Sequence, residues 1–139
     1  MRRILIDWLI EVSSQYRLCE ETIFLTVNYI DRHCSMRQVS RSEFQLVGIA
    51  SLLVASKYEE IYPPEADRYV NITDNAYTRD QLFNKELEIL RDLDFMLTVP
   101  TAFRFLQRFA SLAECDVRLF CMANYFINLA LVDLNMNKW

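Results

Sequence analysis

The stretch Ala50-Ser-Leu-Leu-Val-Ala-Ser-Lys-Tyr-Glu-Glu-Ile-Tyr-Pro-Pro64 decides the fold class of this chain. It is typical of an apolar helix that ends at two prolines, because proline lacks an N–H donor and disfavours a helical residue before it. Helical spacing places one charged residue, Lys57, on an apolar face with Leu53, Val54, Tyr58 and Ile61. A cation in such surroundings needs an acceptor, so Lys57 predicts a partner carboxylate elsewhere in the chain.

The composition around this stretch favours a helical domain. With 139 residues and 53% hydrophobic content, the chain can bury one sizeable core without disulfide bonds. One glycine and three prolines leave few turn residues, which favours an all-α fold over a sheet. The net charge of −4 disfavours nucleic acid as a partner. No apolar run is long enough to cross a bilayer, and we find no signal peptide, so we expect a soluble intracellular chain with no membrane partner.

The cysteines and the single histidine do not suggest a metal site. Cys19, Cys34, Cys115 and Cys121 show no C-x-x-C spacing, and His33 is the only histidine. Metal sites need more closely grouped ligands, and secreted chains favour a disulfide framework. We therefore expect no metal and no cofactor, with the cysteines as small core or boundary residues in a reducing compartment.

The rest of the chain predicts a series of helices. We expect them at 1–16, 22–34, from about 40 to 61, 65–70, 78–92, 101–113 and 116–134. Ser40-Arg-Ser-Glu43 and Thr78-Arg-Asp-Gln81 have the pattern of capping boxes at two of the starts. The chain should break at Asp74-Asn75, and Pro100 is the best candidate domain boundary.

The single glycine, Gly48, falls in the middle of the third predicted helix. Glycine there costs roughly 1 kcal/mol relative to alanine, so a close approach of another helix backbone is expected. We predict that this helix is the central one of the bundle.

Two pairs of opposite charges stand in apolar helix faces. Glu86 is embedded between Leu82 and Ile89 much as Lys57 is in its own helix, so we expect an ion pair at the edge of a hydrophobic surface. A buried pair that only fixes the register of the helices is the alternative. Arg2 and Asp31 form a second predicted pair, which we interpret as structural.

The first helix carries more apolar surface than one core-facing stripe requires. Met1, Ile4, Leu5 and Trp8, edged by Glu11, would form an exposed patch for an extended peptide. A first helix that is buried on all sides explains the same pattern equally well.

Five motifs stand in one order along the chain. They are Met1-Arg-Arg-Ile-Leu-Ile-Asp-Trp8, Asn28-Tyr-Ile-Asp-Arg32, Gln45-Leu-Val-Gly48, Ala55-Ser-Lys-Tyr-Glu-Glu-Ile-Tyr-Pro-Pro-Glu65 and Ile72-Thr-Asp-Asn-Ala-Tyr-Thr78. Together they resemble the cyclin box, most closely that of mitotic cyclins of the A/B type. The resemblance covers 1–100 as an N-terminal cyclin box, which implies five helices around a central third one. Residues 101–139 resemble the first helices of a C-terminal box without its last three.

The resemblance implies a regulatory subunit without catalytic residues. Cyclins of this type bind and activate a cyclin-dependent serine/threonine kinase in the nucleus and cytoplasm during cell division. Two charged residues, Lys57 and Glu86, match the family's contacts to the kinase. The matching apolar rim is Val54, Tyr58, Ile61, Leu87, Leu90, Phe95 and Leu97. The groove that docks Arg-x-Leu peptides of substrates or inhibitors is matched by Met1, Ile4, Leu5, Trp8, Glu11, Phe44 and Gln45, with Phe44 in place of a usual leucine.

Two other classes of function compete with this one. As an enzyme, the chain offers the neighbouring carboxylates Glu59-Glu60 and the Asp92/Asp94 pair, but it shows no nucleophile–base set. A cyclin-fold scaffold or transcription-type factor would share the helices without activating a kinase. The acidic charge balance disfavours its DNA-binding form, and the Lys57–Glu86 pair favours kinase activation.

Overall fold

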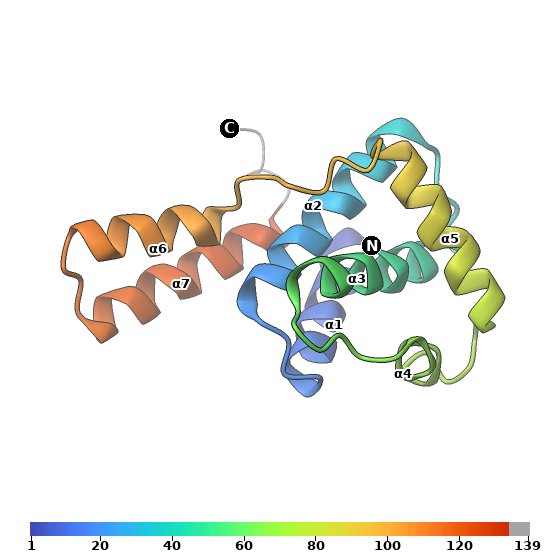
Figure 1. Cartoon of the computed structure of the whole chain (residues 1–139), viewed down its shortest axis with the longest axis horizontal. Helices are drawn as coiled ribbons and strands as arrows, with labels where there is room; N and C mark the ends of the chain where they lie inside the picture. The colour runs from blue at the N-terminus through green and yellow to red at the C-terminus, as the bar shows by residue number, and fades with distance from the viewer. Residues whose placement is uncertain (134–139) are drawn as a thin grey trace.

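The computed structural model describes residues 1–133, which form helices and no strand (Figure 1). The helices are α1 (Arg2–Gln15), α2 (Glu20–Met36), α3 (Phe44–Glu59), α4 (Ala66–Asn71), α5 (Arg79–Asp92), α6 (Ala102–Leu112) and α7 (Val117–Val132). The predicted all-α class is confirmed, and most helix ends lie within two residues of their predicted positions. Leu134, the predicted end of the last helix, lies outside the described residues.

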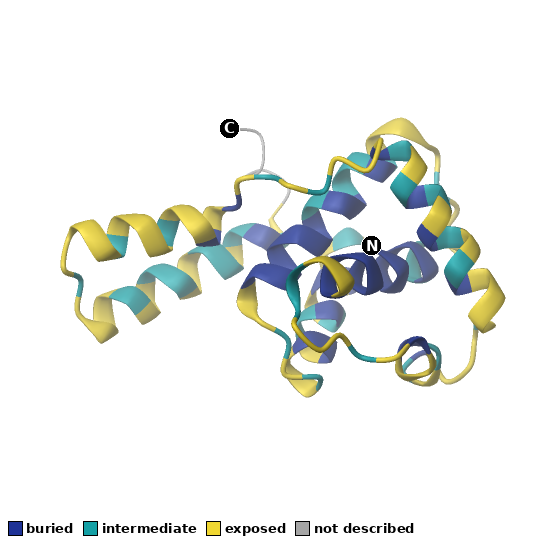
Figure 2. Cartoon of the chain, viewed as in Figure 1, coloured by how far each residue is buried: buried dark blue, intermediate teal, exposed yellow. Residues whose placement is uncertain are grey.

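Helix α3 is the centre of the bundle. It packs against α1, α2, α4 and α5, and every residue from 46 to 56 is buried (Figure 2). A helix that is covered on all sides has no need of a polar face, which explains the long apolar run in its sequence. The predicted central position of the third helix is confirmed.

Gly48 allows α1 to approach α3 closely. A Cβ atom at this position would lie 2.8 Å from Cδ1 and 3.2 Å from Cγ of Leu5. The expectation of a neighbouring helix backbone was wrong, since the close neighbour is a leucine side chain of α1. Its branched end fills the space that a side chain at position 48 would occupy.

Both ends of α3 differ from the prediction. The capping box at its start does not form, because the Ser40 hydroxyl donates to the Glu43 carboxylate (2.8 Å) and residues 41–43 make a turn. Helix α3 therefore starts at Phe44, with Glu43 as an N-cap that makes no side-chain hydrogen bond. At the other end, Glu60 has an extended ψ of 141° and accepts hydrogen bonds from the Cys19 amide (2.8 Å) and the Thr22 hydroxyl (2.5 Å). These bonds draw the chain out of the helix before Ile61.

The start of α5 follows its predicted capping box. The Thr78 hydroxyl accepts from the Gln81 amide at 3.2 Å, and the Gln81 side chain accepts from the Thr78 amide at 2.8 Å. The predicted break before it is also present, since Asp74 and Asn75 have φ angles of 53° and 56°. Left-handed backbone of this kind ends a helix.

Helices α6 and α7 lie side by side and extend away from the other helices (Figure 1). Their base is anchored: Phe103 and Leu131 are buried, and the ring of Phe103 stacks on Phe24 at 5.9 Å. Thr101, the N-cap of α6, also donates its hydroxyl to the buried Glu21 carboxylate at 2.7 Å. Apolar side chains along the rest of the hairpin are exposed: Phe105, Phe109, Leu112, Val117, Leu119, Met122, Tyr125, Phe126 and Leu129. None of the helices within 1–133 has the length and apolar character needed to cross a membrane.

Candidate functional site

Lys57 and Glu86 form the ion pair that their sequence contexts predict. Lys57 Nζ lies 2.7 Å from Oε1 and 2.9 Å from Oε2 of Glu86, so one ammonium bridges both carboxylate oxygens. The carboxylate side chain is only 11% exposed, whereas that of Lys57 is 46% exposed. The pair therefore stands at the boundary between core and surface, with its cation turned outward.

Aromatic rings and apolar side chains surround this pair. The Phe83 ring lies 5.4 Å from Lys57 Nζ and 5.3 Å from the Arg79 guanidinium carbon, so two cations contact its faces. Such cation–π contacts hold the lysine stem in place without neutralising its charge. Tyr58 is fixed by a 2.6 Å hydrogen bond between its hydroxyl and that of Thr98.

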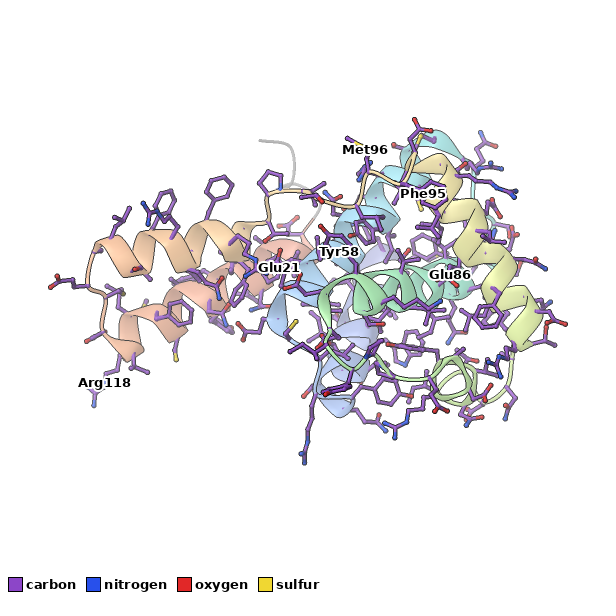
Figure 3. The ribbon with its side chains drawn as sticks, in the orientation of Figure 1. Glu21, Tyr58, Glu86, Phe95, Met96 and Arg118 are labelled. Atoms are coloured by element: carbon purple, nitrogen blue, oxygen red, sulfur yellow. The ribbon has the colours of Figure 1, made fainter. Side chains whose placement is uncertain are left out.

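A strained turn after α5 projects Phe95 to the surface. Asp94 and Phe95 have φ angles of 49° and 56°, a left-handed conformation that a bulky aromatic residue rarely adopts. The Phe95 amide donates to the Leu90 carbonyl (2.9 Å), and Arg32 of α2 donates to the Met96 carbonyl (2.8 Å). Strain that is held by such contacts is a common mark of a functional segment. Figure 3 shows Phe95 and Met96 on the segment that follows α5.

The predicted contact residues differ in how far they are exposed. Tyr58, Ile61, Leu87 and Phe95 are exposed, and Ile61 reaches 87%. Leu90 and Leu97 are half-buried behind them, and Val54, at 3%, belongs to the core and supports the surface from below. We call the exposed and half-buried residues, with Lys57 and Glu86, the α3/α5 face.

A second predicted site is a groove between α1 and the start of α3. Its volume is about 270 Å³, and its lining is Met1, Ile4, Leu5, Trp8, Arg41, Phe44 and Gln45. Ile4 is 74% and Met1 57% exposed, so the alternative of a first helix buried on all sides is wrong at these positions. Leu5 is 7% exposed because it fills the space above Gly48.

The charges at the groove differ from those expected. Glu11, predicted at its edge, is exposed on α1 but is not among the lining residues. Arg41, which sequence reasoning missed, contributes a cation to the lining. The reason is that residues 41–43 form a turn before α3 instead of its first helical turn, which brings Arg41 to the groove.

Arg2 and Asp31 form the predicted structural pair. Arg2 donates from Nε and Nη2 to the two carboxylate oxygens, both at 2.7 Å. Its Nη1 atom donates to the Leu131 carbonyl at 2.9 Å, so one guanidinium joins α1, α2 and α7. Sequence reasoning did not reveal this third contact, because Leu131 lies far along the chain.

Other surface residues were missed as well. Tyr62, at 91%, follows Ile61 in the chain, and Met96, at 66%, follows Phe95; both are exposed. His33 of α2 meets Glu88 and Asp92 of α5, although no local pattern links His33 to the two carboxylates in the sequence. Their separation along the chain explains why spacing rules could not reveal the cluster.

Comparisons with known proteins agree with this architecture. The family described as "Cyclin, N-terminal domain" matches residues 1–98. Cyclin-A1 of Carassius auratus is 47% identical over 135 residues, which cover 97% of this chain and 34% of that protein. G2/mitotic-specific cyclin-B2 of Anguilla japonica is 45% identical over 136 residues, covering 98% of this chain and 34% of that protein. The chain belongs to the cyclin family, and it spans about a third of the length of these two relatives.

A solved structure shows the same fold at lower sequence similarity. The X-ray structure of a viral cyclin from herpesvirus saimiri superposes with a TM-score of 0.87 at 22% identity. The match covers 99% of this chain and 62% of the viral protein. The helix arrangement is therefore the cyclin fold, and it is kept where most side chains differ.

Proposed function

We propose that this chain is part of a regulatory subunit that binds and activates a cyclin-dependent serine/threonine kinase in the control of cell division. Residues 1–100 would form the N-terminal box, and 101–139 the beginning of a second box. The subunit would act in the nucleus and cytoplasm, where such a kinase meets its substrates. The function needs no catalytic residue in this chain, because a regulatory subunit acts by positioning parts of the kinase.

The observation that carries this proposal is the Lys57–Glu86 pair within the exposed α3/α5 face. A half-exposed ammonium beside exposed Tyr58, Ile61 and Phe95 offers a partner one charged anchor in an apolar surround. Interfaces take most of their affinity from a few such anchors, which become buried when water is excluded. Lys57 also has three N–H donors, and Glu86 offers it only two oxygens, so one donor is available to an acceptor on the partner.

The test compares variants of the pair in kinase binding and activation. Lys57→Met keeps the aliphatic stem over Phe83 but removes the charge, and Glu86→Gln keeps the shape of the acceptor. We expect each to weaken kinase binding by at least about tenfold, because a desolvated charge pair at an interface contributes a few kcal/mol. Titration calorimetry with a purified kinase and a peptide phosphorylation assay would measure the two effects.

The control is Asp31→Asn, which removes a carboxylate from a partly buried ion pair away from this face, where the carboxylate is 38% and the arginine 10% exposed. It should change the thermal stability but leave the kinase affinity unchanged. If the Lys57→Met, Glu86→Gln double variant folds and still activates the kinase normally, the α3/α5 face is not the binding site. A chain that binds a kinase without activating it would instead support the cyclin-fold scaffold.

The groove is the proposed docking site for Arg-x-Leu peptides of substrates or inhibitors. An apolar side chain would enter between Met1, Trp8 and Phe44, and an arginine would pair with Glu11 on the exposed side of α1. Arg41 disfavours a cation deep in the groove, so the peptide arginine should stay near its Glu11 edge.

Ile4→Ser tests this docking because Ile4 is 74% exposed and can be changed without opening the core. We expect slower phosphorylation of substrates that carry the motif and an unchanged rate for substrates without it. Leu112→Ser is the matched control, since it replaces an exposed leucine on α6, away from the groove. Equal effects of Ile4→Ser on both kinds of substrate would show that the groove does not dock this motif.

A further inference from the structure

The turn after α5 contains two successive residues with left-handed backbone. Asp94 and Phe95 have φ angles of 49° and 56°. Such a conformation costs free energy in any residue with a Cβ atom, and a bulky aromatic residue adopts it rarely. It persists only where surrounding contacts hold it. The contacts that hold this turn therefore decide where the Phe95 ring lies.

Backbone hydrogen bonds within the turn supply part of that support. The Phe95 amide donates to the Leu90 carbonyl and the Met96 amide to the Leu93 carbonyl, both at 2.9 Å. The carbonyl groups of Met96 and Leu97, in contrast, accept hydrogen bonds from side chains of α2. Figure 1 shows the segment that follows α5 passing beside the end of α2.

Arg32 of α2 contacts both ends of the turn. Its Nη1 atom donates to the Met96 carbonyl at 2.8 Å, and its Nη2 atom lies 3.5 Å from the Leu93 carbonyl oxygen. Leu93 is the C-cap of α5, where the helix dipole favours a cation. Tyr29, on the same face of α2, donates its hydroxyl to the Leu97 carbonyl at 2.9 Å. Helix α2 therefore holds the chain on both sides of the turn.

The chemistry of arginine suits this contact. Within residues 1–133, Arg32 pairs with no carboxylate, and its hydrogen bonds go to backbone carbonyl groups. A hydrogen bond from a charged donor is stronger than one from a neutral donor. The planar guanidinium can also reach two carbonyl groups at once in a fixed geometry, which the ammonium of lysine cannot do.

We propose that Arg32 is a positioning residue for kinase binding. It holds Asp94 and Phe95 in left-handed backbone, so that the Phe95 ring, which is 64% exposed, lies at the surface before a kinase binds. The inference rests on the function proposed above, in which Phe95 belongs to the surface that the kinase contacts. A residue that is preorganised in this way binds more tightly, because binding does not have to order it.

Loss of Arg32 should allow the turn to leave this conformation. Only chains whose turn is left-handed could then bind, and the apparent dissociation constant rises in inverse proportion to their fraction. A turn that stays left-handed in about a tenth of the molecules weakens binding about tenfold. At a saturating concentration of the chain, the kinase should still reach its full rate, because the turn in the complex is unchanged.

The first experiment measures whether Arg32 acts through the Phe95 ring. Arg32→Met keeps an apolar stem but removes the donors, and titration calorimetry with a purified cyclin-dependent kinase should show about tenfold weaker binding. In a Phe95→Ala chain, Arg32→Met should weaken binding no further, because the ring that it positions is absent. Losses that add in the double variant would show that Arg32 acts in another way, and the proposal would be overturned.

Hydrogen exchange separates positioning from a general loss of stability. In the chain without kinase, Arg32→Met should accelerate exchange of the Phe95 amide more than exchange of the α3 amides, because only the turn opens. Equal acceleration of both would mean that Arg32 only stabilises the fold, against the proposal.

Arg37→Met is the matched control. It also removes a guanidinium that joins α2 to α5, but Arg37 bonds to the Asp92 side chain and not to the turn. This variant should lower the melting temperature and leave the kinase affinity unchanged. A loss of affinity as large as that of Arg32→Met would overturn the proposal, because any weakening of the contact between these helices would then suffice.

Two further results keep the proposal testable. If Arg32→Met does not fold, Arg32→Lys, which keeps the charge but not the fixed pair of donors, should weaken binding by about threefold, and an unchanged affinity would overturn the proposal. If Lys57→Met and Phe95→Ala both bind the kinase as the wild type does, the proposed function fails, and this inference fails with it. If those two variants bind weakly but Arg32→Met binds normally, this inference alone fails.

Discussion

Replacing Gly48 by alanine should reveal how closely α1 and α3 pack. The new methyl group would lie 2.8 Å from Leu5 Cδ1 and 3.1 Å from Cδ2, so the leucine must move. Overpacking of this kind costs about 1–3 kcal/mol. Alanine instead of glycine inside a helix contributes about 1 kcal/mol of stability. We therefore expect Gly48→Ala to lower the free energy of unfolding by roughly 1 kcal/mol.

A second background isolates the contact with Leu5. In a Leu5→Ala chain the space above position 48 is open, so Gly48→Ala should raise the free energy of unfolding by about 1 kcal/mol through helix propensity alone. The difference between the two backgrounds, about 2 kcal/mol, is the coupling between the two sites. Urea unfolding followed by circular dichroism would measure all four chains. An identical effect of Gly48→Ala in both backgrounds would refute the contact as the reason for the glycine.

Three further predictions concern hydrogen bonds of the core and the helix starts. Burial raises the pKa of Glu21 above its unfolded value, so the folded state holds a proton on this carboxyl at pH values where the unfolded state has lost it. The free energy of unfolding, relative to that of Glu21→Gln, should therefore fall as the pH rises through the raised pKa. Parallel curves of unfolding free energy against pH for the two chains would contradict this. Thr78→Ala should destabilise the chain by about 1 kcal/mol in urea unfolding and Thr78→Ser by much less, because serine can still cap α5; equal losses would exclude the cap. The Tyr69 hydroxyl donates to the Ser56 hydroxyl at 2.8 Å inside the core. Tyr69→Phe should therefore lower the melting temperature by an amount equivalent to about 1 kcal/mol. An unchanged melting temperature would mean that this hydrogen bond contributes nothing to stability.

The ion pair of the α3/α5 face could be predicted because each partner stands out in the sequence of its own helix as a charged residue among apolar ones. Lys57 and Glu86 are opposite charges in apolar stripes, and helical periodicity shows this without knowledge of the fold. Their surroundings were only partly predictable. The left-handed turn that projects Phe95 depends on a contact with Arg32 of α2, which is far from this turn in the sequence.

Local motifs predicted the helix starts only where no other partner competed. Ser40–Glu43 and Thr78–Gln81 have similar patterns, but the Ser40 hydroxyl bonds to the Glu43 side chain, whereas that of Thr78 bonds to the Gln81 backbone. Gly48 indicated a close approach, and only the structure shows that a side chain makes it. The cluster around His33 joins α2 to α5, which are far apart in the sequence. No periodicity within a single helix can indicate such a contact.

The complete burial of α3 has a consequence for the timing of hydrogen exchange. Its amides are enclosed by four neighbouring helices, so they can exchange with solvent only when the whole bundle opens. The outer parts of α6 and α7 have no such cover and are held at their base by Phe103 and Leu131. In deuterated water, α3 should therefore lose its amide signals at the rate of global unfolding, and the hairpin much sooner by opening on its own. Equal rates in a dilute monomer would show that the chain on both sides of Pro100 opens as one cooperative unit.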